Sequence, residues 1–121
     1  MVDPDTVTWK GIRELFAPER FSFFFCEELA EAVRAMKSEK FDCAIVDIQA
    51  EGNRPVTSIL QALDPAMPVI LTTERNTPDL EIGAYRQQAF YYFVKPFGGE
   101  ELKLVVQEAL RKSNPEQALV R

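Results

Sequence analysis

The sequence predicts an α/β protein in which helices cover both faces of a parallel β-sheet. Two features support this prediction. Short apolar runs, of the kind found in strands buried on both faces, recur along the chain and alternate with segments whose apolar residues have helical spacing. Parallel strands need crossover connections, which are usually helices, so the alternation fits this class. The chain has 121 residues, 46% hydrophobic and 27% charged, which suits one globular domain.

The first half of the chain predicts two helices and two strands. Residues 6–16 carry apolar side chains on one face, and Asp5 suits the N-cap position before them. Residues 21–25 are aromatic on both faces, which predicts a strand packed between helices. Residues 29–36 return to helical spacing, and residues 41–47 form an apolar run typical of a buried strand.

The second half repeats this alternation. Residues 55–63 predict a short helix and residues 67–73 a strand. A helix then begins at Thr77-Pro78, where a hydroxyl cap precedes proline at the first helical position. Residues 91–97 predict the last strand, and the last helix opens at Gly98-Gly99 with two glutamates in its first turn. The helical pattern dissolves near its end, so we assign residues 1–112 to the domain and 113–121 to a tail or linker.

Three of the predicted strands end on side chains capable of chemistry: the carboxylate of Asp47, the hydroxyl of Thr73 and the ammonium of Lys95. Ligands of open α/β sheets bind beyond the carboxyl ends of the strands. We therefore expect the three side chains to converge on an anion-handling site that contains a nucleophilic carboxylate. The alternative for each is a structural role: a polar strand end for Asp47, β-propensity for Thr73, and a solvent-seeking lysine for Lys95.

These residues, in this order and with room between them for a loop, a helix and a strand, resemble the receiver domain of bacterial response regulators. The resemblance runs over residues 2–112. It implies a flavodoxin-like, doubly wound, five-stranded parallel sheet of strand order 2-1-3-4-5 with five flanking helices.

The resemblance also implies roles at the site. Asp47 would be the phosphoacceptor, and its donor would be a phosphohistidine on a sensor histidine kinase or phosphotransfer protein. Lys95 would contact the phosphoryl oxygens, aimed by a cis peptide bond to Pro96. Thr73 would hydrogen-bond the phosphoryl group and move toward it as a switch residue. Strand alternation turns its neighbour Thr72 to the opposite face of the sheet.

A second switch residue and an output surface follow from the same resemblance. Tyr92 occupies the position of an aromatic switch whose inward and outward rotamers would report phosphorylation. Its alternative is a plain core aromatic. With Phe90, Tyr91, Phe93 and Phe97 nearby, the face made by the fourth helix, fifth strand and fifth helix is aromatic enough to form a partner or homodimer surface.

Magnesium is the cofactor that the resemblance implies. Its ligands would be Asp3, Asp5, Asp47 and the carbonyl of Gln49. Receivers usually carry two adjacent acidic residues after the first strand, whereas this chain has Pro4 at the second of these positions. A hard cation loses affinity with each carboxylate removed, so we expect weak magnesium binding and slow phosphorylation. Asp5 has a competing role as a helix cap.

Two further departures from the family predict local structure. Only Met1 and Val2 precede Asp3, which is too short for a full first strand, so we expect the backbone near residues 21–23 and 41–43 to lack its pairing. The family's usual Gly-Ala before the fifth strand is Gln88-Ala89 here, so that turn must form without the tolerance of glycine for positive φ.

Composition excludes several functions. A net charge of −5 argues against nucleic-acid binding, and the absence of histidine excludes His-based triads and most zinc sites. No apolar run reaches membrane-spanning length, the start does not resemble a signal peptide, and two cysteines without metal-ligand spacing suit a reduced cytoplasmic protein.

Three functional hypotheses remain open. The first is a non-enzymatic phosphoacceptor module that switches a partner surface in two-component signalling and transcription regulation. The second is a degenerate receiver that acts as a phosphorylation-independent docking module. The third is a flavodoxin-like enzyme or nucleotide binder, which the scarcity of glycine and the lack of a glycine-rich phosphate loop disfavour.

Overall fold

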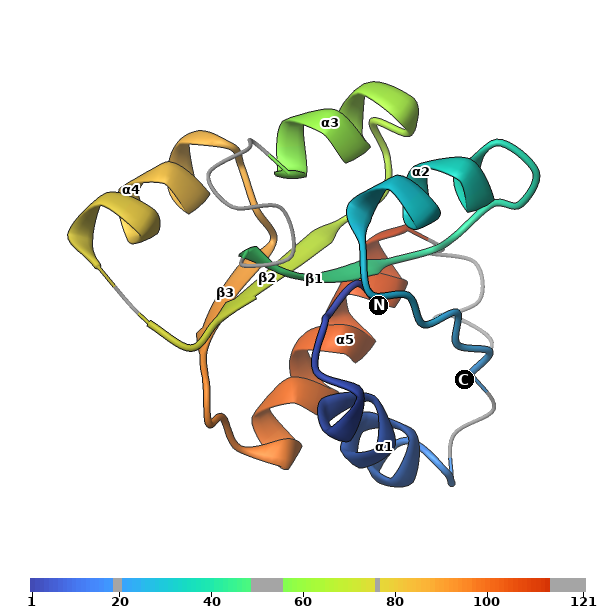
Figure 1. The fold of residues 1–121 in the computed structure, drawn as a ribbon, viewed down its shortest axis with the longest axis vertical. Helices are drawn as coiled ribbons and strands as arrows, with labels where there is room; N and C mark the ends of the chain where they lie inside the picture. The colour runs from blue at the N-terminus through green and yellow to red at the C-terminus, as the bar shows by residue number, and fades with distance from the viewer. Residues whose placement is uncertain (19–20, 49–55, 76, 114–121) are drawn as a thin grey trace.

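Three parallel strands form the sheet at the centre of the computed structural model, which describes residues 1–18, 21–48, 56–75 and 77–113. Helices cover both faces of this sheet (Figure 1). In chain order the elements are α1 (Thr6–Leu15), α2 (Leu29–Met36), β1 (Ala44–Asp47), α3 (Val56–Leu63), β2 (Val69–Thr73), α4 (Pro78–Arg86), β3 (Tyr91–Val94) and α5 (Gly99–Ser113).

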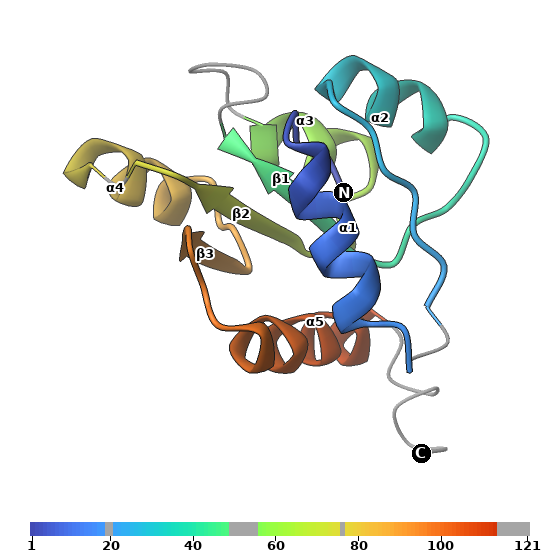
Figure 2. The ribbon, with the colours of Figure 1, turned by 60° about the horizontal axis from the view of Figure 1, so that its bottom comes forward.

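The layers follow the predicted α/β class. Helices α1 and α5 lie on one face of the sheet and α2, α3 and α4 on the other (Figures 1 and 2). Two hydrophobic clusters fill the spaces between. Ile45 and Ile70 point toward α1 and α5, and Val46 and Leu71 toward α2, α3 and α4. The alternation along β1 and β2 therefore buries both faces, as the near-continuous apolar runs predict.

The order of strands within the sheet is β1-β2-β3, and all pairs are parallel. Asp47 lies opposite Thr72, and Thr72 lies opposite Phe93. Residues paired in this way project to the same face of a sheet. The register therefore places Asp47, Thr72 and Phe93 on the face covered by α1 and α5.

The predicted five-stranded sheet is not observed among the described residues, and its strand order is not confirmed. The predicted first strand is reduced to Val2, which makes isolated parallel bridges to Cys26 and to Val46. Residues 21–25, predicted as a strand, are irregular. The physical reason is that Val2 alone pairs with the neighbouring segments. One paired residue cannot maintain a regular ladder of hydrogen bonds on either side, so these segments stay extended without regular pairing.

Residues 21–25 also differ from the prediction in how they are buried. Phe21, Phe23 and Phe25 face the core beside α1, whereas Ser22 and Phe24 are exposed. A cavity of about 820 Å³ lies between this segment and residues 41–45, and Met1 and Val2 are among the residues that line it.

The five helices fall where the sequence predicts them, and their starts show why. Asp5 caps α1 by accepting a hydrogen bond from the Val7 amide at 3.0 Å, and Thr77 caps α4 by accepting one from the Leu80 amide at 3.2 Å. Helix α3 begins at Val56, and the preceding Pro55, predicted as its first residue, lies outside the described residues.

The turn between α4 and β3 adopts the conformation expected where glycine is usual. Gln88 has a φ of 61° and is the residue other than glycine with positive φ in the described part of the chain. Its amide donates to Tyr85 O at 3.0 Å, and the next amide, of Ala89, donates to Ala84 O at 3.1 Å. Left-handed backbone costs a side-chain-bearing residue roughly 1–2 kcal/mol, so this turn carries strain.

Candidate functional site

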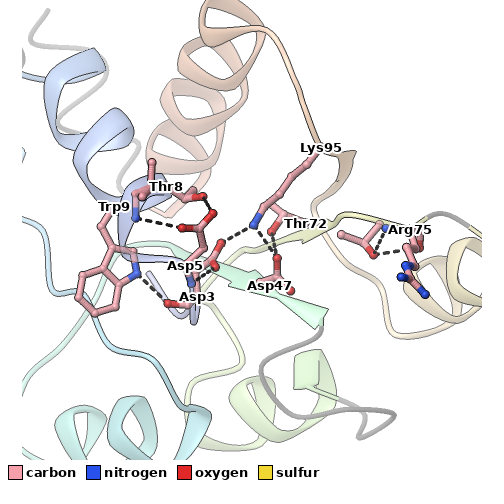
Figure 3. A network of polar contacts seen from close by, with 10 residues as sticks. Asp3, Asp5, Thr8, Trp9, Asp47, Thr72, Arg75 and Lys95 are labelled. Atoms are coloured by element: carbon pink, nitrogen blue, oxygen red, sulfur yellow. Dashed lines mark hydrogen bonds and ion pairs between the residues drawn. The ribbon is translucent and has the colours of Figure 1, made fainter.

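Two buried carboxylates share one ammonium at the carboxyl edge of the sheet. Lys95 Nζ lies 2.6 Å from Asp3 Oδ2 and 2.7 Å from Asp47 Oδ2 (Figure 3). Asp3 is fully buried and Asp47 is 2% exposed, so the ammonium offsets part of the negative charge that burial makes costly. The structure thus brings Asp47 and Lys95 together as the sequence predicts.

The position of each group follows from local structure. Asp47 ends β1, and its amide donates to Val2 O at 2.8 Å. Lys95 follows β3, and its amide donates to Thr73 O at 2.7 Å, which extends the strand pairing to the site. The Lys95–Pro96 peptide bond is cis, in agreement with the family resemblance.

Asp3 is held by its backbone and by its side chain. Its amide donates to Cys26 O at 3.0 Å, while its carbonyl accepts a hydrogen bond from Trp9 Nε1 at 2.8 Å. Its Oδ1 accepts from the Asp5 amide at 2.8 Å. Trp9 is not among the site residues that the sequence predicts. The available signal was that the chain has one tryptophan, whose N–H requires a partner wherever the ring is buried.

The carboxylate of Asp5 serves the helix. Its Oδ1 accepts from the Val7 amide and its Oδ2 accepts from Thr8 Oγ1 at 2.9 Å. Hydrogen bonds from the Thr8 hydroxyl and the Val7 amide lower the pKa of Asp5. Of its two predicted roles, the structure shows capping.

Thr72 lies beside Asp47, whereas the Thr73 hydroxyl binds the backbone of Arg75. Thr72 Oγ1 makes a long contact of 3.5 Å with Asp47 Oδ2, whereas Thr73 Oγ1 donates to Arg75 O at 3.0 Å and accepts from Arg75 N at 3.2 Å. As predicted from the alternation of side chains along a strand, Thr72 and Thr73 project to opposite faces of the sheet. The register pairs Asp47 with Thr72, so Thr73 projects to the opposite face, and its expected approach to the phosphoryl group stays a prediction.

Tyr92 lies on β3 on the opposite face of the sheet from Asp47, and its ring packs partly buried against the cluster beside α2, α3 and α4. Burial, with a smaller contribution from Glu81, raises the pKa of Tyr92. Its inward position matches one of the two rotamers expected of a switch and also matches a plain core aromatic.

Burial acts to lower the pKa of Lys95, but the hydrogen bonds and negative charges of Asp3 and Asp47 outweigh it, and the pKa is raised. The lysine therefore remains an ammonium at neutral pH. A permanent cation between two carboxylates is suited to binding the oxygens of an incoming anion.

The predicted magnesium ligands are brought together only in part. Asp3 and Asp47 are adjacent through Lys95, Asp5 is turned to α1, and Gln49 lies outside the described residues. No group of three or more acidic or thiol side chains gathers into a metal site within the described ranges. Magnesium commonly takes one or two carboxylates and completes its shell with water and phosphate oxygens, so the pair of Asp3 and Asp47 fits it.

Comparison with known proteins shows the family to which this chain belongs. The model of the response regulator receiver domain matches residues 1–107. The transcriptional regulatory protein GlrR of Escherichia coli K12 is 28% identical over 115 residues, which cover 93% of this chain and 26% of that protein. The DNA-binding transcriptional regulator NtrC of the same strain is 31% identical over 93 residues, 75% of this chain and 20% of NtrC. The chain thus spans about a quarter or less of these relatives.

Solved structures support the fold. A signal receiver domain of an HD domain-containing protein from Pseudomonas fluorescens Pf-5 superposes with a TM-score of 0.87 at 22% identity, covering 95% of this chain and 94% of that one. A CheY-like receiver domain protein from Methanospirillum hungatei JF-1 gives a TM-score of 0.85 at 20% identity, with coverage of 95% and 94%. Within the described ranges, no helix combines the length and the apolar character needed to cross a bilayer.

Proposed function

Because this chain belongs to the response regulator receiver domains, the modules of two-component signalling, we propose that Asp47 accepts a phosphoryl group from a sensor histidine kinase or phosphotransfer protein. The observation that carries the proposal is the contact of 2.7 Å between Lys95 Nζ and a buried Asp47 carboxylate at the end of β1. A strand-end carboxylate beside a fixed cation is arranged to attack a phosphorus centre and to stabilise the charge that the oxygens carry.

The proposed step is a single displacement. A carboxylate oxygen of Asp47 attacks phosphorus, the new P–O bond forms, and the P–N bond of the phosphohistidine breaks with its electron pair kept by the imidazole nitrogen. The product is an aspartyl phosphate. The phosphoryl oxygens then compete with the carboxylates for Lys95, because they carry more negative charge than the carboxylate that it contacts now.

Receiver domains generally bind Mg²⁺ at the phosphorylation site. Here Asp3 and Asp47 would hold the ion, which when bound neutralises charge on the transferring oxygens. Pro4 stands where relatives usually have a second acidic residue, so we propose that magnesium binds weakly and that phosphorylation is slow.

Switching is proposed to run through Thr73 and Tyr92. Thr73 would leave the backbone of Arg75 to hydrogen-bond the phosphoryl group. Thr72 already contacts Asp47 and is the rival for this role. Thr73→Ala should abolish the phosphorylation-dependent response of the output surface while phosphorylation itself persists. If Thr72→Val abolishes the response and Thr73→Ala does not, the assignment belongs to Thr72.

The output surface is proposed to be the face formed by α4, β3 and α5, where two copies of the chain would meet. Large apolar side chains are exposed on all three elements: Ile82, Tyr85, Tyr91, Val94 and Leu104. Tyr85 is 72% and Leu104 63% exposed, which suits burial in an interface. Tyr85→Glu should weaken phosphodonor-induced dimerisation in sedimentation experiments. The control is Val7→Glu, which introduces the same charge at a residue 77% exposed on α1.

Mass spectrometry after treatment with acetyl phosphate and Mg²⁺ tests the central proposal. We expect the mass of one phosphoryl group in the wild type and none in Asp47→Asn. The control Asp42→Asn removes an exposed carboxylate just before β1 and should be phosphorylated like the wild type. Equal labelling of Asp47→Asn and wild type would place the modification elsewhere.

A second candidate function is a docking module that needs no phosphorylation. It is favoured by Pro4 and by the absence of a three-ligand acidic cluster in the described part of the chain. It predicts no mass change even at high donor and magnesium concentrations, together with unchanged partner binding by Asp47→Asn.

Receivers are typically non-enzymatic signalling modules, and we propose that this one works in the cytoplasm, where its kinase would present the phosphohistidine.

A further inference from the structure

We propose that Trp9 is a positioning residue of the site: its indole N–H holds the backbone of Asp3 so that the Asp3 carboxylate meets Lys95. The biological purpose of this role rests on the proposed function, whereas the contacts that define it do not. Trp9 Nε1 lies 2.8 Å from Asp3 O, and Lys95 Nζ lies 2.6 Å from Asp3 Oδ2 (Figure 3). At the site, Trp9 is bound to Asp3 and would act on Lys95 and Asp47 through that residue.

Asp3 needs such an anchor because its strand is so short. Only Val2 is bridged on both sides, and the residue after Asp3 is Pro4, which has no N–H to donate. Proline also restricts the residue before it to extended backbone. The amide of Asp3 donates to Cys26 O, and its carbonyl accepts from Trp9 Nε1. In a longer ladder, strand pairing would do this work; here a side chain does.

The indole is itself held in place by aromatic stacking. Its ring stacks on Phe25 with centroids 5.7 Å apart, and Phe25 stacks on Phe23 at 5.4 Å. Arg13 Cζ lies 5.0 Å from the centre of the Phe25 ring. Phe25 directly precedes Cys26, so one aromatic column fixes both backbone anchors of Asp3: the indole that binds its carbonyl and the segment that binds its amide.

The ring and the N–H can be separated by mutation. Trp9→Phe keeps an aromatic ring for stacking and removes the donor. The matched control Phe25→Leu removes the stacking partner and leaves the donor. If Trp9 merely fills space, both variants lose stability and neither changes the site beyond that loss.

The decisive measurement is made on metal-free protein. The Asp5 amide, which donates to Asp3 Oδ1, reports the position of the carboxylate. At matched global stability, its hydrogen exchange should be roughly tenfold faster in Trp9→Phe than in the wild type, because its acceptor is no longer fixed. Phe25→Leu, which loosens the ring but keeps the donor, should accelerate this exchange by a smaller factor, about threefold at most. Unchanged exchange in Trp9→Phe, or equal acceleration in both variants, would overturn the proposal.

A magnesium titration by calorimetry adds a functional readout. Outer-shell partners of ligating carboxylates typically contribute at least tenfold to metal affinity, so Trp9→Phe should weaken Mg²⁺ binding by about that factor. Because the chain has one tryptophan, the indole fluorescence of the wild type should follow the same titration. If the wild type binds no Mg²⁺, the magnesium part of the proposed function fails, and the exchange experiment alone decides the role of Trp9.

Discussion

Lys95 Nζ lies 2.7 Å from Asp47 Oδ2 while also contacting Asp3, so one lysine pairs with both the proposed phosphoacceptor and its acidic neighbour. The lysine thereby offsets one of the two negative charges, and the site keeps a net negative charge that suits a cation. An incoming phosphoryl group or cation must compete with contacts that already exist, which links binding at the site to the stability of the fold.

Removing the shared ammonium should be costly. Lys95→Met is expected to lower the free energy of unfolding by about 3 kcal/mol without metal, because it leaves buried carboxylates beside one another. Added Mg²⁺ should restore more stability to this variant than to the wild type. The control is Lys10→Met, at an exposed position on α1, which should change little. Chemical denaturation measures both variants, and equal stabilities would contradict the shared-cation interpretation.

The same contact predicts a pH dependence at the alkaline end. The pKa of Lys95 is raised, so its contribution is fully present below the unfolded value of about 10.4 and is lost as pH rises through the folded pKa. Tyr91 and Tyr92, whose pKa values are also raised, add a loss in the same range. The stability difference between wild type and Lys95→Met isolates the lysine. It should be constant from pH 7 to about 10 and shrink above that.

Restoring the missing acidic residue should strengthen metal binding. Pro4→Asp is expected to raise Mg²⁺ affinity about tenfold, because it adds a carboxylate next to Asp3. Pro4→Asn, which changes the backbone equally but adds no charge, is the control. Calorimetry compares the two. If both variants bind like the wild type, other oxygens already complete the site.

Asp5 offers a test that separates capping from metal binding. Asp5→Asn keeps a capping oxygen, so the melting temperature should be retained. Its Mg²⁺ affinity should stay within twofold of the wild type. Asp5→Ala should lower the melting temperature through loss of the bonds to Val7 and Thr8. The lowered pKa of Asp5 means that the cap contributes above the unfolded pKa and weakens as pH falls through the folded one. A large loss of Mg²⁺ affinity in Asp5→Asn would instead make Asp5 a ligand.

The strained turn before β3 predicts a stabilising substitution. Gln88→Gly should raise the free energy of unfolding by about 0.5–1 kcal/mol, since glycine adopts a φ of 61° without a steric penalty and this gain exceeds its greater freedom in the unfolded chain. Arg86→Gly, within α4, should instead destabilise by a similar amount. Thermal unfolding of the pair decides the sign, and a loss of stability in Gln88→Gly would show that its side chain matters more than its backbone.

The cavity beside Met1 predicts that the sheet can be completed. An extension of about five apolar residues before Met1 should raise the melting temperature by several degrees, by supplying pairing to residues 21–24 and 41–43. A Gly-Ser extension of equal length is the control and should not. No gain from the apolar extension would mean that the flanking backbone is already adequately satisfied.

Much of the architecture could be predicted from local sequence. The helix starts at Thr6 and Pro78 follow from caps that act within one turn, and the strand runs ending in Asp47 and Thr73 follow from apolar composition. These are interactions between residues close in the chain, so the sequence expresses them directly. The turn at Gln88 was singled out because glycine is usual there, but the positive φ of Gln88 itself was not predicted.

Other features depended on which residues become neighbours in space. The sheet has three regular strands and isolated bridges at Val2, because pairing requires partners of sufficient length on both sides. Strand alternation separates Thr72 from Thr73, but only the register between β1 and β2 decides which of them faces Asp47. The hydrogen bond from Trp9 to Asp3 likewise crosses from a helix to a strand end. The sequence by itself determined the fold class and the residues available for chemistry. The tertiary structure decided which of them meet, because a hydrogen bond or ion pair depends on distances of a few ångströms that only packing sets.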